Sequence, residues 1–581
     1  MSSPRTLAGA RTSRGRLGWV ARMVAALQSP PWIARLVGLV GLVTVLSALS
    51  PAIRARAHLI AQLVPAGFPA AATTGAAAVG LVLVALSRAL RRGKFRAWLL
   101  ATVLSLLAAV LNVVKGLDVE EAALSVAVLV LLLTARRNFT ARPDPRSLRR
   151  LVGVLVAGPV IAATAGWIWL NLDPEDQAAG TGQGDRFLQA ISGLVGIPGP
   201  VRFTTPAHAA HAATGMLVLG AAVALTALLV AVQPADGPHR LSQEDTDRLR
   251  GLLERWGGID SLSYFALRGD RAAIFSPSGK AAVTYRVVGS VSLAAGDPIG
   301  DPEAWPGAID RWLCEARSFG WVPAVLGASE PAARVYRRAG LDALELGDEA
   351  VVHVADFSLE GRSMRAVRQA VSRCTRTGMT VQCHRMAELS PEEVAEMSQL
   401  ADRWRDGEVE RGFSMALGRF GDPVDGQAMV VTATDAEGCL RGLLHFVPWG
   451  SDGLSLDLMR RDRTAENGIV EHMIVGLVQA APGLGIRRVS LNFAVFRSVF
   501  ARGERLGAGP VLRAWHSVLL FASRFWQIES LYRANAKYQP EWVPRFVCFR
   551  SSADLPRVGV AGLRAEAFLV APRWARRVIR P

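Results

Sequence analysis

Three polar strings in the second half of the chain combine residue types that move protons and stabilise negative charge. The first string runs from Ser455 through Asp457 and Arg460 to Asn467 and Glu471. Its pattern predicts a strand that leads through a loop into a helix, so these polar side chains are expected near one strand end.

The other two strings also bring polar residues to the ends of predicted elements. The second delivers Asn492 and Arg497 from a strand end, and the third contains Tyr532, Lys537 and Arg545. Each of these residues taken alone is more often a salt-bridge partner or a helix cap than a catalyst. The case for a site depends on the three strings converging in space.

A basic helix is predicted over residues 362–377. At about 100° per residue, its five arginines fall on one stripe, and Val367, Ala370 and Cys374 fall on the opposite side. The stretch contains no acidic residue that could form (i, i+4) ion pairs. Because arginine suits bidentate contact with phosphate, we expect this stripe to bind phosphates such as those of tRNA. The five residues are Arg362, Arg365, Arg368, Arg373 and Arg376.

Composition limits the possible partners. The formal net charge of +17 favours a negative partner, either nucleic acid or anionic lipid headgroups. The five cysteines all lie in the second half without a CxxC pair, which fits a reducing compartment and disfavours a disulfide framework or structural zinc. His208 and His211 have HxxH spacing but no evident third ligand. We therefore expect no metal and no other cofactor.

The first 235 residues are rich in uncharged apolar runs that approach the thickness of a bilayer. Clusters of arginine alternate with base-poor loops between these runs, which by the positive-inside rule predicts six spans with both termini in the cytoplasm. The predicted spans are residues 34–53, 68–87, 97–114, 119–135, 151–171 and 212–232. The base-poor stretch 172–211 is predicted to be an outer loop.

Beyond a polar linker at residues 233–240, short β-like runs alternate with amphipathic helical stretches, so this half is predicted to be α/β. A helix near residues 330–339 closes at Gly340 and resembles the late helix of the GNAT (acetyltransferase-like) fold.

Taken together, the strings resemble the phosphatidylglycerol lysyltransferase family, also called multiple peptide resistance factor, and its actinobacterial relatives. The resemblance is carried by the Arg-Gln-Ala-Val-Ser-Arg core of the basic helix, by Asp-Leu-Met-Arg-Arg…Asn-Gly-Ile…Glu, and by Lys537-Tyr-x-Pro-x-Trp-x-x-Arg545. It covers about residues 240–575 and implies two GNAT-like lobes joined by the basic helix. The expected organisation is a basic tail 1–33, a transmembrane domain 34–232, a linker 233–240, a first lobe 241–361, a connecting helix 362–377, a second, catalytic lobe 378–560 and a basic segment 561–581.

The resemblance implies an enzyme of the plasma membrane that transfers an amino acid, lysine or alanine first, from aminoacyl-tRNA to the hydroxyl of a lipid such as phosphatidylglycerol. The product would change membrane charge and resistance to cationic peptides. Charged tRNA occurs in the cytoplasm, where the predicted orientation also places the catalytic half. A separate aminoacyl-tRNA synthetase is expected to supply the donor. The amino acid, the lipid acceptor and the oligomeric state stay open at this point.

Roles within this reaction are hypotheses. Lys537 would stabilise charge on the oxyanion or the leaving group, Asp457 would bind the substrate amine or assist proton transfer, and Asn492 would donate hydrogen bonds. Arg460 and Arg545 would contact phosphates. The remaining residues expected to bind substrate or phosphate are Asn467, Glu471, Arg497 and Tyr532.

One departure from the family pattern concerns the strand that contains Asn492. Better-known relatives have Asp-Leu-Gly-Met-Ala where this chain has Ser490-Leu-Asn-Phe-Ala, so the role of that carboxylate is not carried over. Three other functions stay open. An acetyl-CoA-dependent acyltransferase would need a pyrophosphate loop that we do not find. A lipid flippase with a regulatory soluble half, and a Fem-type enzyme that aminoacylates peptidoglycan precursors, are the other two.

Overall fold

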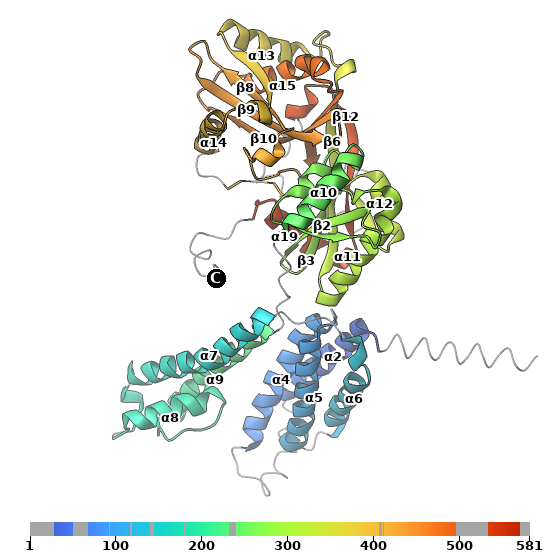
Figure 1. The fold of residues 1–581 in the computed structure, drawn as a ribbon. Helices are drawn as coiled ribbons and strands as arrows, with labels where there is room; N and C mark the ends of the chain where they lie inside the picture. The colour runs from blue at the N-terminus through green and yellow to red at the C-terminus, as the bar shows by residue number, and fades with distance from the viewer. Residues whose placement is uncertain are drawn as a thin grey trace, which may run out of the picture. The chain divides into compact units, whose positions relative to one another are not determined.

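The structure is a computed structural model in which the chain divides near residue 235 into two compact units (Figure 1). The residues described are 28–49, 68–91, 93–116, 119–139, 145–172, 174–178, 180–231, 240–405, 409–410, 412–495 and 533–569.

The first unit begins with four helices that pack on one another. They are α2 (Pro30–Leu49), α4 (Phe68–Leu90), α5 (Phe95–Gly116) and α6 (Val119–Thr134), and α6 returns to contact α2. Helices α2 and α4 cross where Gly41 faces Gly80, since a Cβ added to either glycine would lie 2.6 Å from the carbonyl oxygen of the other. Small residues of this kind let helix backbones approach closely in a lipid environment.

Three further helices complete this unit. The long apolar helices α7 (Pro145–Leu172) and α9 (Pro206–Ala231) pack together, and the shorter α8 (Gln183–Leu194) packs against both. The sequence prediction treated residues 172–211 as a loop, because α8 mixes polar and apolar residues and is too short to resemble a span. The presence of α8 corrects that part of the prediction.

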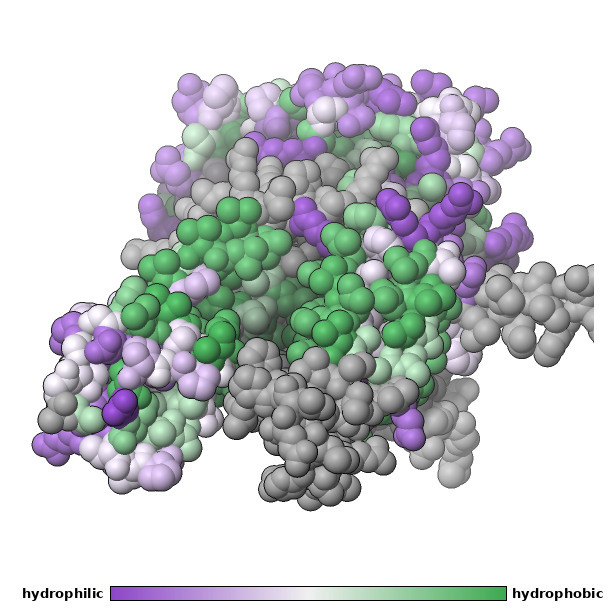
Figure 2. Space-filling view, turned by 90° about the horizontal axis from the view of Figure 1, so that it is seen from below, coloured by the Kyte–Doolittle hydropathy of each residue, from purple (hydrophilic) through white to green (hydrophobic). Residues whose placement is uncertain are grey.

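Hydrophobic residues gather over the helices of the first unit, as Figure 2 shows. Helix α6 has 16 residues, fewer than the ~20 that cross a typical hydrocarbon core, and α4 contributes a shorter apolar stretch. The count of six spans and their orientation therefore stay predictions. The segments long and apolar enough to cross a membrane are Pro30–Ser47, Phe95–Asn112, Arg150–Leu172 and Pro206–Leu228.

The second unit is built on one continuous 12-stranded sheet with the order β1-β2-β3-β5-β12-β6-β11-β10-β9-β8-β7, with β4 paired to β2. The strands of the first lobe are β1 (Ala272–Phe275), β2 (Ala281–Val288), β3 (Val291–Ala295), β4 (Ile299–Gly300), β5 (Val322–Ala328) and β6 (Asp342–His353). Those of the second lobe are β7 (Thr380–Arg385), β8 (Met429–Thr434), β9 (Leu440–Trp449), β10 (Gly453–Arg461), β11 (Arg488–Val495) and β12 (Glu541–Phe549).

The two lobes exchange their final strands. The last strand of the second lobe, β12, lies between β5 and β6, and the last strand of the first lobe, β6, pairs with β11. Each lobe therefore completes its sheet with a strand of the other. The α/β class predicted from the alternating patterns is confirmed.

Helices cover both faces of the second lobe. Residues Leu443 and Leu444 are neighbours on β9 and so point to opposite faces. Leu444 packs in the cluster that includes residues of α13 (Arg365–Arg376) and α15 (Ile469–Ala480), whereas Leu443 packs with residues of α14 (Pro391–Arg405). The first lobe is covered by α10 (Gln243–Trp256), α11 (Trp305–Phe319), α12 (Glu330–Arg338) and α19 (Leu555–Ala565).

A buried ion cluster holds the exchanged strands together. Arg545 of β12 is 3% exposed and donates to Glu349 Oε2 of β6 over 2.9 Å and to Asp260 Oδ1 over 2.7 Å. Its third nitrogen donates to Ser261 Oγ over 2.7 Å, and Ser490 of β11 donates to Glu349 Oε1. The guanidinium of Arg545 thus links β12 to β6 and to the loop after α10, and Ser490 links β11 to the same cluster through Glu349.

Replacement of Arg545 by Ala should lower the free energy of unfolding of the second unit, because Asp260 and Glu349 would remain buried without the cation that neutralises them. Breaking a buried ion pair from one side costs about 3–5 kcal/mol. Chemical unfolding of the detergent-solubilised chain, followed by tryptophan fluorescence, measures this loss. Arg334→Ala is the control, since Arg334 forms an exposed pair with Glu330; equal losses in the two variants would contradict the role assigned to Arg545.

The free energy of unfolding of the second unit should also fall as the pH rises from about 4 to 7. Burial, followed by the charge of Asp260, raises the pKa of Asp297 to about 7. A carboxyl with a raised folded-state pKa binds its proton more tightly when folded, so its stabilisation is complete below the unfolded pKa and is lost above about 7. Asp297→Asn should flatten this slope in thermal unfolding of the solubilised chain. A slope unchanged by the substitution would assign the pH dependence to other groups.

Candidate functional site

The candidate site lies where β10 and β11 diverge. The two strands pair in parallel at only three positions, from Gly453↔Arg488 to Ser455↔Ser490. Beyond these pairs each strand has an irregularity, in β10 between Leu456 and Leu458 and in β11 after Ser490. From there β10 stays paired with β9 and β11 stays paired with β6, so the two strands separate.

A surface pocket of about 350 Å³ lies where α13, the end of β10 and the start of α15 meet. Gly468, the residue before α15, has φ 102°, and a Cβ placed there would lie 2.6 Å from Cβ of Ala370 on α13. Glycine at this position therefore permits both the left-handed turn and the close approach of the two helices. The lining residues are Ala370, Arg373, Arg461, Asn467, Gly468, Ile469, Val470 and Glu471.

The pocket is suited to an anion. The first residues of α15 line it, and the unsatisfied N–H groups of a 12-residue helix favour negative charge at this end. Arg373 enters from α13 and donates to the carbonyl oxygen of Asn467 over 3.2 Å, while Arg461 enters from β10. Two guanidiniums from separate elements thus flank the helix start.

Lys537 is attached to one side of this pocket through Glu471, with which it forms an ion pair. Its side chain is 34% exposed. Two residues before Lys537, Asn535 donates to the carbonyl oxygen of Leu491 over 3.2 Å, which fixes the segment on β11. Burial and the charge of Glu471 raise the pKa of Tyr538 well above its usual range, so this phenol stays protonated. Lys537 and Glu471 therefore connect the pocket to the end of β11.

Asn492 occupies the irregularity of β11 with φ 70°, a conformation that costs a non-glycine residue energy. Its backbone N–H donates to Ser490 Oγ over 3.3 Å. Its side-chain oxygen is buried and has no hydrogen-bond partner within the described part of the chain. Such strain is common at functional sites, and the role of Asn492 stays a prediction.

Asp457, predicted to be catalytic, does not line the pocket. Its side chain is 4% exposed; Oδ1 accepts from the backbone N–H of Leu417 over 2.6 Å, and Oδ2 lies 2.7 Å from Nδ1 of His445. The ring of His445 packs against Phe420, on the side of the sheet where α14 packs. A carboxylate enclosed in this way has no access to a substrate amine, which corrects that part of the prediction, whereas its predicted help with proton transfer stays a prediction.

Two predicted phosphate contacts are also corrected. Arg460 donates to both carboxylate oxygens of Glu410, at 2.7 and 2.8 Å, and lies outside the pocket lining. Arg545 is buried in the ion cluster that joins the lobes, where a phosphate has no access. Arg497 and Tyr532 lie outside the described residues, so their predicted roles are untouched.

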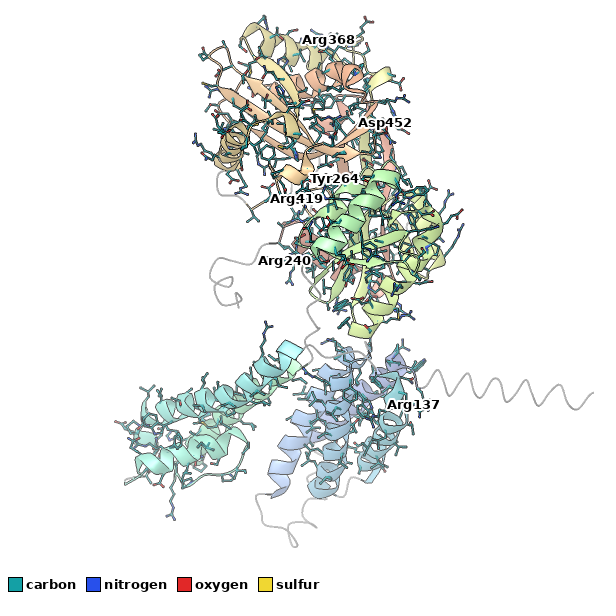
Figure 3. The ribbon with its side chains drawn as sticks, viewed as in Figure 1. Arg137, Arg240, Tyr264, Arg368, Arg419 and Asp452 are labelled. Carbon is teal, nitrogen blue, oxygen red and sulfur yellow. The ribbon has the colours of Figure 1, made fainter. Side chains whose placement is uncertain are left out.

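The basic helix is one turn shorter than predicted, since α13 begins at Arg365 and leaves Arg362 before it. Arg368, labelled in Figure 3, donates to the carbonyl oxygens of Leu359 and Gly361, so it secures the chain that enters the helix. The other four arginines are exposed and form no ion pair with any described residue.

The sequence analysis assigned no role to three residues that line the pocket or pair with a predicted site residue. Arg461 and Gly468 stood inside the first string without a role, although an arginine and a glycine flanking a strand-to-helix loop could have indicated an anion pocket. His445 gave no signal, because a lone histidine in an apolar strand resembles an ordinary core residue. The described residues contain no group of three or more His, Cys, Asp or Glu placed to hold a metal ion.

Comparison with known proteins decides the family. Residues 250–549, more than half of the chain, match the family model described as phosphatidylglycerol lysyltransferase, C-terminal. The chain belongs to this family. Residues 26–232 match the model described as the transmembrane region of lysyl-tRNA synthetase. The resemblance predicted from the basic helix and from the first and third strings is confirmed, as is the membrane region.

Among its relatives is the lysylphosphatidylglycerol biosynthesis bifunctional protein LysX of Rhodococcus jostii, 44% identical over 585 residues, or 99% of this chain and 51% of the relative. The LysX protein of Mycobacterium avium is 44% identical over 92% of this chain and 46% of the relative. The chain thus spans about half the length of these relatives. A solved structure, L-PGS from Bacillus licheniformis, is 24% identical, covers 56% of this chain and 97% of that chain, and has a TM-score of 0.49.

Charge reversal on the exposed face of α13 should weaken tRNA binding. Arg365→Glu with Arg376→Glu removes two cations that no described carboxylate neutralises, and each lost phosphate contact lowers the salt slope of log K by about 1. Titration of the solubilised chain with tRNA over a range of salt concentrations measures this slope. Arg337→Glu with Arg338→Glu makes the same charge change on α12; an equal effect there would mean that only net charge matters.

Proposed function

We propose that the chain transfers an aminoacyl group from aminoacyl-tRNA to the hydroxyl of a membrane phospholipid such as phosphatidylglycerol. The observation that carries the proposal is the pocket at the start of α15, where Arg373 and Arg461 supply positive charge and Lys537 is attached through Glu471. Membership of the phosphatidylglycerol lysyltransferase family supports the same reaction.

The reaction needs no further activation, because the donor is already an ester. The lipid hydroxyl oxygen attacks the ester carbonyl carbon, a new C–O bond forms, and the bond to the tRNA ribose oxygen breaks. The proton leaves the lipid hydroxyl and ends on that ribose oxygen. In this proposal Lys537 stabilises the negative charge that develops along this path, and Glu471 holds the lysine in position and relays the proton.

Phosphate binding would position the two substrates. Arg373 and Arg461 hold a phosphate at the start of α15, while the exposed arginines of α13 contact the tRNA backbone nearby. Positioning of this kind can supply a large share of the rate enhancement in a transfer between two bound substrates. No metal or other cofactor enters this scheme.

Lysine is the amino acid that we propose. The relatives that match almost the whole chain carry names that specify lysylphosphatidylglycerol. We propose that a separate synthetase charges the tRNA, and that the second unit faces the cytoplasm, where charged tRNA is available. The arginine-rich loops of the first unit support this orientation.

Lys537→Ala should lower lipid aminoacylation by about 10²–10³, the range seen when one oxyanion-stabilising group is removed, while tRNA affinity changes little. Mass spectrometry of lipids from membranes that express the chain measures the product, which is heavier than phosphatidylglycerol by one amino-acid residue. Lys280→Ala is the matched control, because Lys280 is an exposed lysine of the first lobe.

Two results would count against this assignment. Weaker tRNA binding with unchanged turnover in Lys537→Ala would make Lys537 a binding residue. Absence of any new lipid from the unaltered chain, with folded protein and charged tRNA present, would reject the lipid as acceptor.

A further inference from the structure

Helix α8 runs alongside α7 and α9 within the first unit (Figure 1). The contacts between these helices are close enough to exclude side chains. A Cβ added to Gly193 of α8 would lie 2.7 Å from Cβ of Met216 on α9, and one added to Gly220 of α9 would collide with the carbonyl oxygen of Leu194. A Cβ added to Gly166 of α7 would lie 3.4 Å from Cβ of Ala190, so α7 and α8 are in van der Waals contact there. The small residues therefore fix where α8 ends along its neighbours.

The end of α8 lies deep within the apolar length of α9. Gly220 is 14 residues beyond Pro206, which at 1.5 Å per residue is ~21 Å along the helix. The apolar span of α9 runs from Pro206 to Leu228, and that of α7 ends at Leu172. The first turn of α8 lies beside the last turn of α7, because Arg186 donates to the side-chain oxygen of Asn171 over 2.7 Å. Helix α8 thus runs beside α7 and α9 for about half of their membrane-spanning length.

The chain that returns from this depth has few free backbone donors. Between Val195 and Val201 two positions are prolines, Pro198 and Pro200, which have no N–H. The N–H groups of residues 195, 196 and 197 donate to carbonyl oxygens at the end of α8, and that of Val201 donates to the buried side-chain oxygen of Gln189. Of the seven residues from Val195 to Val201, only Gly199 has a backbone N–H without such a partner among the described residues. Non-helical backbone within hydrocarbon requires this kind of internal satisfaction.

The outward side of α8 is strongly apolar. Gln189, Ala190 and Gly193 pack inward, whereas a stripe of large apolar residues is exposed, including Val195 at 69%. No described residue covers this stripe, and water would be a poor environment for so many adjacent apolar side chains. Large apolar residues are also exposed on α7 and α9, among them Ile161 and Val218. Its members are Phe187, Leu188, Ile191, Val195 and Ile197.

We propose that residues 183–203 form a re-entrant hairpin that inserts to about the middle of the bilayer, with the stripe of α8 in contact with lipid acyl chains. The helix carries the chain inward and the proline-containing segment carries it back to the level of Phe203, which pairs with Gln177. The inference depends on the membrane unit alone and does not rest on the proposed aminoacyl transfer.

Depth measurement on the full chain in phospholipid nanodiscs tests this arrangement. Cys314, Cys439 and Cys383, which are not buried, are first replaced by Ser. Nitroxides are then attached to single cysteines made by Phe187→Cys, Ile191→Cys, Val195→Cys and Arg202→Cys, and collisions with oxygen and with a water-soluble nickel chelate are compared. Leu225→Cys on α9 is the lipid-facing reference and Arg337→Cys on α12 is the aqueous reference.

The expected result is a depth profile that rises and then falls. From Phe187 to Val195 the depth should increase by ~12 Å, following the 1.5 Å rise per residue, and Arg202 should return to the interface. A constant shallow depth at residues 187, 191 and 195 would make α8 a helix lying flat at the surface. Access of the nickel chelate at all of them would make it a water-exposed loop. Protection from both reagents would mean that protein covers the stripe. Each of these three outcomes overturns the proposal.

Discussion

The fold of the second unit depends on one buried guanidinium. Arg545 sits where the two lobes exchange strands, and its donors are divided between Glu349 on β6 and Asp260 in the loop after α10. Removing two carboxylates and an arginine from water is costly, so the cluster is stable only when all its members are in place. The register of β12 between β5 and β6 brings them together, and the segment that contains Lys537 leads directly into β12. The position of the candidate site is therefore linked to the same exchange.

Much of the architecture could be predicted from local patterns. The basic stripe of α13, with Val367, Ala370 and Cys374 buried behind it, followed from helical periodicity alone. The apolar runs of α7 and α9 indicated membrane helices because their length and composition match a bilayer. The strand exchange could not be predicted, because the patterns of β5, β6, β11 and β12 identify strands but not their neighbours, and pairing across lobes leaves no local signature.

The site was predicted only in part. Asn467, Glu471 and Arg373 do line one pocket, and Lys537 does pair with Glu471, so the convergence of the first and third strings was foreseen. Asp457 and Arg460 lie on the same strand as the pocket residue Arg461, yet His445 and Glu410 engage them instead. Both partners come from elsewhere in the chain, from β9 and from the segment after α14. Sequence spacing gives the element on which a charged residue lies but not the partner that neutralises it.

The exchange of strands also has a consequence for biosynthesis. Arg545 is separated from Glu349 by 196 residues. At about 5–20 residues per second, a ribosome takes roughly 10–40 s to deliver β12 after β6. During that interval β5 and β6 have open edges, and the carboxylates of Asp260 and Glu349 have no cation. The second unit therefore stays exposed to proteases and chaperones until β12 emerges, long after the first helices are available for insertion into the membrane.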